Sequence, residues 1–158
     1  MVETGAIARQ LVDGQSLIHA ACARHGGTVL TRVLARVVEL ARILPLMEQW
    51  LMALRPNAPF HQVQALPAQA EGAGLSEAAR GALGHWLRIE NGRIAHYQIV
   101  APTSWNFSPR DAAGTPGALE MALVDAPLDQ ASGEGPGQSV AVQHIVRSFD
   151  PCMVCTVH

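Results

Sequence analysis

The chain has 158 residues, a formal net charge of −2 and 49% apolar residues, a size and composition that suit one globular domain with a buried core. All eleven basic residues are arginines scattered without a basic stripe, so nucleic acid is not an expected partner. No apolar run reaches the ~18 residues needed to cross a bilayer, and the first residues lack the basic-then-apolar pattern of a signal peptide. We therefore expect no direct membrane insertion and a cytoplasmic location, with any membrane association arising through partners.

Helical periodicity marks the first third of the chain. A short helix is predicted over 3–12, closed by Asp13-Gly14. Apolar residues then recur at three- and four-residue steps from Leu30 to Leu51, with arginine and glutamate at other positions. This pattern predicts a long amphipathic helix over about 28–54. Pro45 should kink or split that helix.

A loop and a hairpin are expected next. Proline, glycine and glutamine with little periodicity predict a surface loop over 55–74. The segment 75–85 is expected to begin with a short helical turn. Alternating apolar residues on both sides of Asn91-Gly92 then predict a hairpin over about 86–100. Pro102 cannot donate to a ladder and should end its second strand.

The last third of the chain predicts two further helices. Thr115-Pro116 resembles an N-cap followed by proline at the first helical position, opening a helix over 117–123. The segment 131–138 is expected to be a loop, and 139–147 a short helix that leads to the terminal cysteines. Together these elements predict an α+β fold in which helices dominate, with a small β-ribbon.

The terminal segment 150–158 carries a Cys-x-x-Cys pair, Cys152 and Cys155, and ends in a histidine. Two thiolates at this spacing can bind one soft metal ion, such as nickel, iron, copper or zinc. Two ligands do not complete a site, and Cys22 is the only other cysteine, so histidine, a cofactor or another chain must supply the rest. A redox pair or two inert thiols are the alternatives.

Several blocks in the right order and spacing resemble the large subunit of nickel-iron hydrogenases. They are Glu3–Arg9, Glu77–Leu83, Gly92–Asn106, Pro109–Asp111 and the terminal segment. The resemblance spans essentially the whole chain and implies the C-terminal part of that family's large-subunit fold. The ending most resembles hydrogen-sensing regulatory members.

The resemblance implies a set of metal ligands. Cys152 would be a terminal nickel ligand, and Cys155 would bridge nickel to an iron that carries carbon monoxide and cyanide. His158 and the backbone carbonyl of Ile99 would bind a magnesium or iron ion. Without the resemblance, a histidine at a chain end is usually mobile.

The resemblance also implies roles for three residues around the metals. Arg80 would lie over the open metal site as a catalytic residue and donate to cyanide, with Asp150 fixing its orientation. Thr103 would hydrogen-bond to cyanide. The family usually has proline where Ala79 stands, which changes how the backbone before Arg80 is restrained. From the residues alone, Arg80 would be a solvated helix residue and Asp150 part of a helix-ending Asp-Pro.

The family's other nickel ligands lie in an Arg-x-Cys-Gly-x-Cys motif that these 158 residues lack. We therefore interpret 1–158 as a C-terminal segment of a hydrogenase large subunit whose parent splits hydrogen heterolytically, in uptake or in sensing. Its expected partners are the N-terminal part of the large subunit, with the first cysteine pair, and an iron-sulfur small subunit. The large and small subunits would form a heterodimer. A non-catalytic assembly or scaffold protein and a simple metal-binding module are the alternatives.

Overall fold

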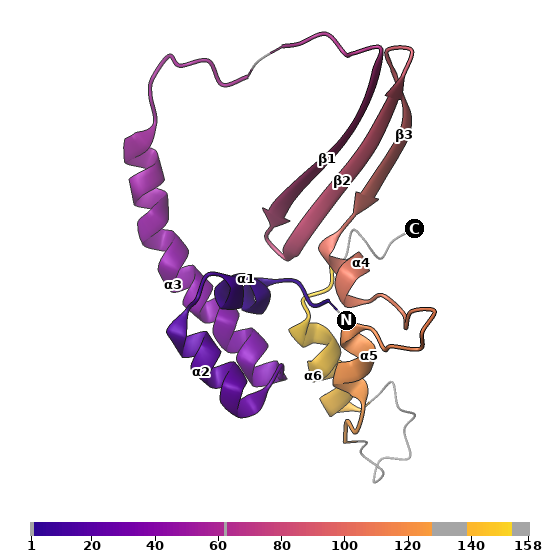
Figure 1. Cartoon of the computed structure of the whole chain (residues 1–158). Coiled ribbons are helices and arrows are strands. Elements are labelled where there is room, and N and C mark those ends of the chain that lie inside the picture. The colour runs from indigo at the N-terminus through magenta and orange to yellow at the C-terminus, as the bar shows by residue number, and fades with distance from the viewer. Residues whose placement is uncertain (1, 62, 128–138, 153–158) are drawn as a thin grey trace.

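A computed structural model describes residues 2–61, 63–127 and 139–152. Helices dominate these ranges, and one three-stranded antiparallel sheet accompanies them, which confirms the predicted α+β class. The helices are α1 (Ala6–Val12), α2 (Ser16–His25), α3 (Val29–Ala53), α4 (Pro102–Asn106), α5 (Ala118–Leu123) and α6 (Val140–Ser148) (Figure 1). The strands are β1 (Gln69–Ala78), β2 (Gly81–Glu90) and β3 (Arg93–Val100).

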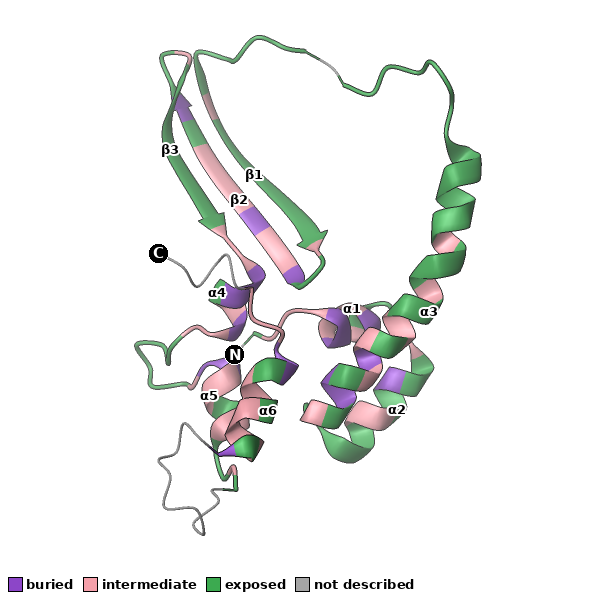
Figure 2. Ribbon diagram, turned by 180° about the vertical axis from the view of Figure 1, so that it is seen from behind, coloured by how far each residue is buried: buried purple, intermediate pink, exposed green. Residues whose placement is uncertain are grey.

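The apolar core lies where α1 and α2 pack on the first half of α3. Its buried members are Ala6, Ile7, Ile18 and Ala35, with partly buried Leu11, Cys22, Leu34 and Val38 around them. Figure 2 shows that the second half of α3 extends beyond this core and is largely exposed. The core therefore secures only the N-terminal half of the longest helix.

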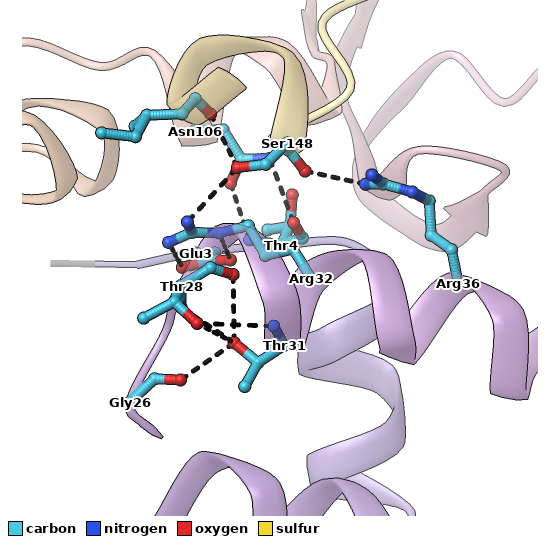
Figure 3. Close-up of polar contacts among 10 residues, drawn as sticks. Glu3, Thr4, Gly26, Thr28, Thr31, Arg32, Arg36, Asn106 and Ser148 are labelled. Atoms are coloured by element: carbon cyan, nitrogen blue, oxygen red, sulfur yellow. Dashed lines mark hydrogen bonds and ion pairs between the residues drawn. The ribbon is translucent and has the colours of Figure 1, made fainter. Parts of the chain in front are cut away.

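Two threonines begin α3. The Thr28 backbone N–H donates to Thr31 Oγ1 over 2.8 Å, and that hydroxyl donates to the carbonyl of Gly26 over 2.9 Å (Figure 3). The helix then continues through Pro45 to Ala53, so of the two expected effects of Pro45, a kink or a split, the split does not occur. A proline removes only one backbone hydrogen bond, and the turns on either side keep theirs.

The sheet has the order β1-β2-β3, and it corrects two expectations. The loop expected over 55–74 ends early because β1 begins at Gln69, and the helical turn expected in 75–85 is a strand pair. Small residues and glycine give β1 a weak alternation of its own, so pairing with β2 decides its conformation. The predicted Asn91-Gly92 hairpin is present, with φ of 52° and 72° at its two central residues.

The remaining helices differ from the expectations in detail. Both α2 and α4 were missed, and α5 begins after Gly117, whose N–H donates to Glu120 Oε2 over 3.1 Å. The helix expected over 139–147 is α6, whereas the loop expected over 131–138 lies outside the described residues. Within the described ranges, no helix is long and apolar enough to span a membrane.

Candidate active site

Arg80 and Asp150 lie next to each other although seventy positions separate them. Arg80 is in the turn between β1 and β2, and Asp150 lies two residues after Ser148, the last residue of α6. The Arg80 Nε atom is 3.5 Å from Asp150 Oδ1, and the two side chains are 43% and 45% exposed. A pair this exposed contributes little to stability. The geometry places the Asp150 carboxylate against the Nε edge of the guanidinium.

The turn that carries Arg80 lies directly against the segment before α1. Gly81 has a φ of +137°, and a Cβ atom there would come within 2.6 Å of Thr4 Oγ1 and 2.8 Å of the Gly5 nitrogen. Only glycine combines this backbone conformation with so close an approach. The glycine after Arg80 is therefore required for the turn to reach the helical part of the chain.

A polar cluster on the Asp150 side of the pair holds the end of α6. The Glu3 carboxylate accepts from Arg32 Nε over 2.7 Å and from its Nη2 over 3.0 Å (Figure 3). Arg32 is only 5% exposed, its guanidinium lies 3.8 Å from the centre of the Phe149 ring, and its Nη1 donates to Ser148 Oγ. Arg36 Nη1 donates to the Ser148 carbonyl over 2.7 Å. These contacts hold the last turn of α6. They therefore also hold the backbone that leads to Asp150.

Arg9 makes the corresponding contacts with the β1–β2 turn. Its guanidinium binds both carboxylate oxygens of Glu39 at 2.7 Å, and it donates to Glu77 Oε2 over 2.8 Å. It also donates to the carbonyls of Ala78 and Ala79, each over 3.1 Å. The Glu39 hydrogen bonds, opposed in part by desolvation, raise the pKa of Arg9. In the sequence, Arg9 and Glu3 are recognisable only as parts of the family block Glu3–Arg9, and no local pattern predicts a role for either of them.

Thr103 and Cys152 are also brought together. Thr103 is buried in the first turn of α4, and its Oγ1 accepts from the backbone N–H of Cys152 over 2.9 Å. The nearby Asn106 binds the backbone N–H and carbonyl of Thr4 over 2.8 and 3.0 Å. Both α4 and the chain after α6 are thus anchored to the same central region.

A cavity of about 20 Å³ lies where these segments meet. Its lining includes Thr4, Arg36, Ala79, Arg80 and Asp150. A space of this size holds roughly one water molecule. The Arg80 and Asp150 pair therefore lies beside a small cavity.

The proposed metal ligands are only partly covered by the structure. Cys155 and His158 lie outside the described residues, and Ile99 is an exposed residue of β3. No group of three or more cysteine, histidine or acidic side chains among the described residues could hold a metal ion. Cys152 offers a soft sulfur donor two residues after Asp150, with its backbone anchored, which fits one ligand of a soft metal. The described residues alone therefore do not offer a complete set of metal ligands.

Comparison with known families assigns the chain. The model of the nickel-dependent hydrogenase family matches residues 3–158. The chain belongs to this family. Among nickel-dependent hydrogenases, the uptake hydrogenase large subunit of Cupriavidus necator is 49% identical over 92 residues, which cover 58% of this chain and 14% of the relative. That of Alcaligenes hydrogenophilus is 43% identical over 102 residues, 65% of this chain and 16% of the relative.

Solved hydrogenase structures share the fold. A [NiFeSe] hydrogenase variant from Desulfovibrio vulgaris Hildenborough matches with a TM-score of 0.85 and 32% identity over 99% of this chain and 35% of that chain. The reduced, active Ni-Fe-Se hydrogenase of Desulfomicrobium baculatum matches with a TM-score of 0.80 and 35% identity, over 99% of this chain and 34% of that chain. The resemblance to hydrogenase large subunits is confirmed. The chain spans about a third of these solved relatives.

Proposed function

We propose that this chain is the C-terminal part of the large subunit of a nickel-iron hydrogenase, which cleaves molecular hydrogen heterolytically. The observation that carries the proposal is the arrangement around Cys152. Asp150, two residues before Cys152, pairs with Arg80. The backbone N–H of Cys152 itself donates to buried Thr103. This arrangement supplies a soft sulfur donor with an anchored backbone and, through Asp150, a nearby guanidinium, which suits a soft metal with polar groups around it.

The proposed metal centre is shared between this chain and its partner segment. Cys152 and Cys155 would hold nickel, with Cys155 bridging to an iron that carries carbon monoxide and cyanide. His158 and the Ile99 carbonyl would hold a magnesium or iron ion. When bound, the nickel-iron pair would supply the redox-active centre at which hydrogen reacts.

Arg80 acts in this proposal through its fixed positive charge and its N–H groups. Asp150 faces Arg80 Nε, which leaves the Nη N–H groups of the guanidinium to donate to a cyanide bound at the metal centre. Such a planar cation can polarise a neighbouring molecule or assist proton transfer. Thr103 retains one hydroxyl proton while it accepts from Cys152, so it can donate to a bound cyanide.

The partners in this proposal are the N-terminal part of the large subunit, with the first cysteine pair, and an iron-sulfur small subunit that removes electrons. This chain matches only a small share of each relative. The proposed N-terminal partner corresponds to the part of the relatives that this chain does not match. Relatives described as hydrogenase large subunits favour the enzyme over the scaffold alternative. Uptake and hydrogen sensing share this chemistry, and the rate of hydrogen-dependent dye reduction would separate them.

The test is anaerobic purification through a tag on this chain, followed by metal analysis and by sequencing of the polypeptides that copurify. We expect nickel, iron, and a polypeptide with the Arg-x-Cys-Gly-x-Cys motif. Cys152→Ser should remove the nickel, whereas the matched control Cys22→Ser, in the α1–α3 core, should retain it. A metal-free preparation without such a polypeptide would instead support the scaffold.

A further inference from the structure

The turn that carries Arg80 lacks the backbone geometry that two-residue hairpins favour. Ala78 pairs with Gly81, so Ala79 and Arg80 are its two central residues. Neither has a positive φ, whereas both central residues of the 91–92 turn in the same sheet do. Turns with positive φ match the twist of the flanking strands and support themselves. In the turn at Arg80 the positive φ comes only at Gly81, so its two central peptides are open to stabilisation by contacts from outside the hairpin.

Arg9 supplies that support from α1. It donates to the Ala78 and Ala79 carbonyls at 3.1 Å, which are the two consecutive peptide oxygens directly before Arg80. Glu39 of α3 binds the other side of the guanidinium through two hydrogen bonds of 2.7 Å. The turn is thus connected through one planar group to α1 and α3, two of the three helices that form the core.

We propose that Arg9 is a positioning residue for Arg80. It holds the peptide units before Arg80 and so fixes where that guanidinium lies relative to Asp150. Lysine cannot replace it, because an ammonium group has no planar fork to bind Glu39 and two carbonyls together. The catalytic consequence rests on the function proposed above for Arg80, whereas the structural consequence does not.

Arg42 is the matched control. Like Arg9, it joins α3 and α1, since its Nη1 donates to Gln10 Oε1 over 2.6 Å and its Nη2 binds Asp13. Within the described residues, Arg42 forms no hydrogen bond or ion pair with the β1–β2 turn. A lysine at this position therefore weakens the same helix pair without releasing Arg80.

The first measurement is hydrogen–deuterium exchange of the peptide 76–83 in the purified complex. Arg9→Lys should speed exchange there by roughly tenfold, because two hydrogen bonds to the turn are lost. Arg42→Lys should leave that peptide unchanged. Equal exchange in Arg9→Lys and wild type would overturn the proposal. This readout does not depend on hydrogen chemistry, so a wild-type complex without hydrogenase activity would refute the proposed function alone.

The second measurement is a double-mutant cycle on hydrogen-dependent dye reduction, with nickel content measured in parallel. Arg9→Lys should lower kcat by on the order of tenfold, and adding it to Arg80→Lys should cause no further loss. A residue that acts only through Arg80 has no effect once that arginine is gone. Independent, multiplicative losses would show a separate structural role and overturn the proposal.

A rescue variant covers the case in which Arg9→Lys fails to assemble. Ala79 is exposed and is the first central residue of a turn without positive φ, a position where proline fixes the backbone. Ala79→Pro in the Arg9→Lys background should restore slow exchange over 76–83 together with assembly. Assembly that stays lost despite the proline would count against a positioning role for Arg9.

Discussion

The backbone N–H of Cys152 donates a hydrogen bond of 2.9 Å to the Oγ1 atom of Thr103. Thr103 is buried in the first turn of α4. A short helix after the sheet therefore holds the backbone of Cys152, which is close to the C-terminus. The family resemblance implied only a contact between Thr103 and cyanide. The hydroxyl therefore has a structural contact within the chain itself, in addition to the proposed one with the metal centre.

Thr103→Val should lower the nickel content of the purified complex. Valine has nearly the same shape but leaves the Cys152 N–H without its acceptor, at a cost of about 1–3 kcal/mol. Thr103→Ser keeps the hydroxyl and is the matched control. Nickel per chain, measured by mass spectrometry, should fall only in the valine variant. Equal nickel content in both variants would contradict the anchoring role.

Arg80→Lys should retain the metals and lose most hydrogen activation. Lysine offers a mobile point charge in place of a planar fork that Asp150 orients. We expect hydrogen-dependent dye reduction to fall by on the order of 10²-fold, the usual scale for a lost proton-transfer or electrostatic group. Arg88→Lys, at an exposed ion pair on β2, serves as the control. Full nickel content with near-wild-type turnover would show that Arg80 is merely structural.

Glu3→Gln should destabilise the chain by about 3 kcal/mol, because it leaves the buried guanidinium of Arg32 without its counter-charge. Urea denaturation at low protein concentration measures the free energy of unfolding. Glu90→Gln breaks the exposed pair with Arg88 and should cost less than about 1 kcal/mol. Similar losses in the two variants would mean that burial of Arg32 has no energetic consequence.

The isolated chain should self-associate through its exposed apolar surface. Large apolar side chains are exposed along the second half of α3, among them Leu44, Met47, Trp50, Leu51 and Met52. A surface of this kind normally marks a contact with another segment. Light scattering should show oligomers, and Leu51→Glu with Met52→Glu should reduce them without unfolding the helix. A chain that stays monodisperse and monomeric at high concentration would instead indicate an independent domain.

Asp111 should stabilise the chain only above its own pKa. The backbone N–H of Thr115, and then that of Ala113, donate to its carboxylate and hold the pKa of Asp111 below its ordinary range. Because the folded pKa lies below the unfolded one, this contribution is complete above the unfolded pKa and is lost as the pH falls through the folded value. Carboxyl NMR titration measures the shift, and Asp111→Ala should remove the corresponding pH dependence of unfolding. An ordinary pKa would contradict these hydrogen bonds.

Local signals predicted part of the fold well. The Asn91-Gly92 turn and the amphipathic helix that became α3 were both found from residues close in sequence. The strand β1 was missed because its glycines and alanines carry almost no alternation, and its conformation depends on pairing with β2. Pairing of Arg80 with Asp150 came from the family resemblance, since no periodicity connects residues seventy positions apart.

The sequence by itself determined the family, and it predicts a soft-metal site in the terminal segment, because the two thiols and their spacing are local chemistry. Only the tertiary structure revealed Arg9 and Arg32 as the groups that hold the β1–β2 turn and the end of α6. Each is one arginine among eleven, and although Arg9 belongs to the family block Glu3–Arg9, no local pattern assigns either arginine a partner. Their roles come from partners 29 to 116 positions away, which only the folded chain brings within hydrogen-bonding distance.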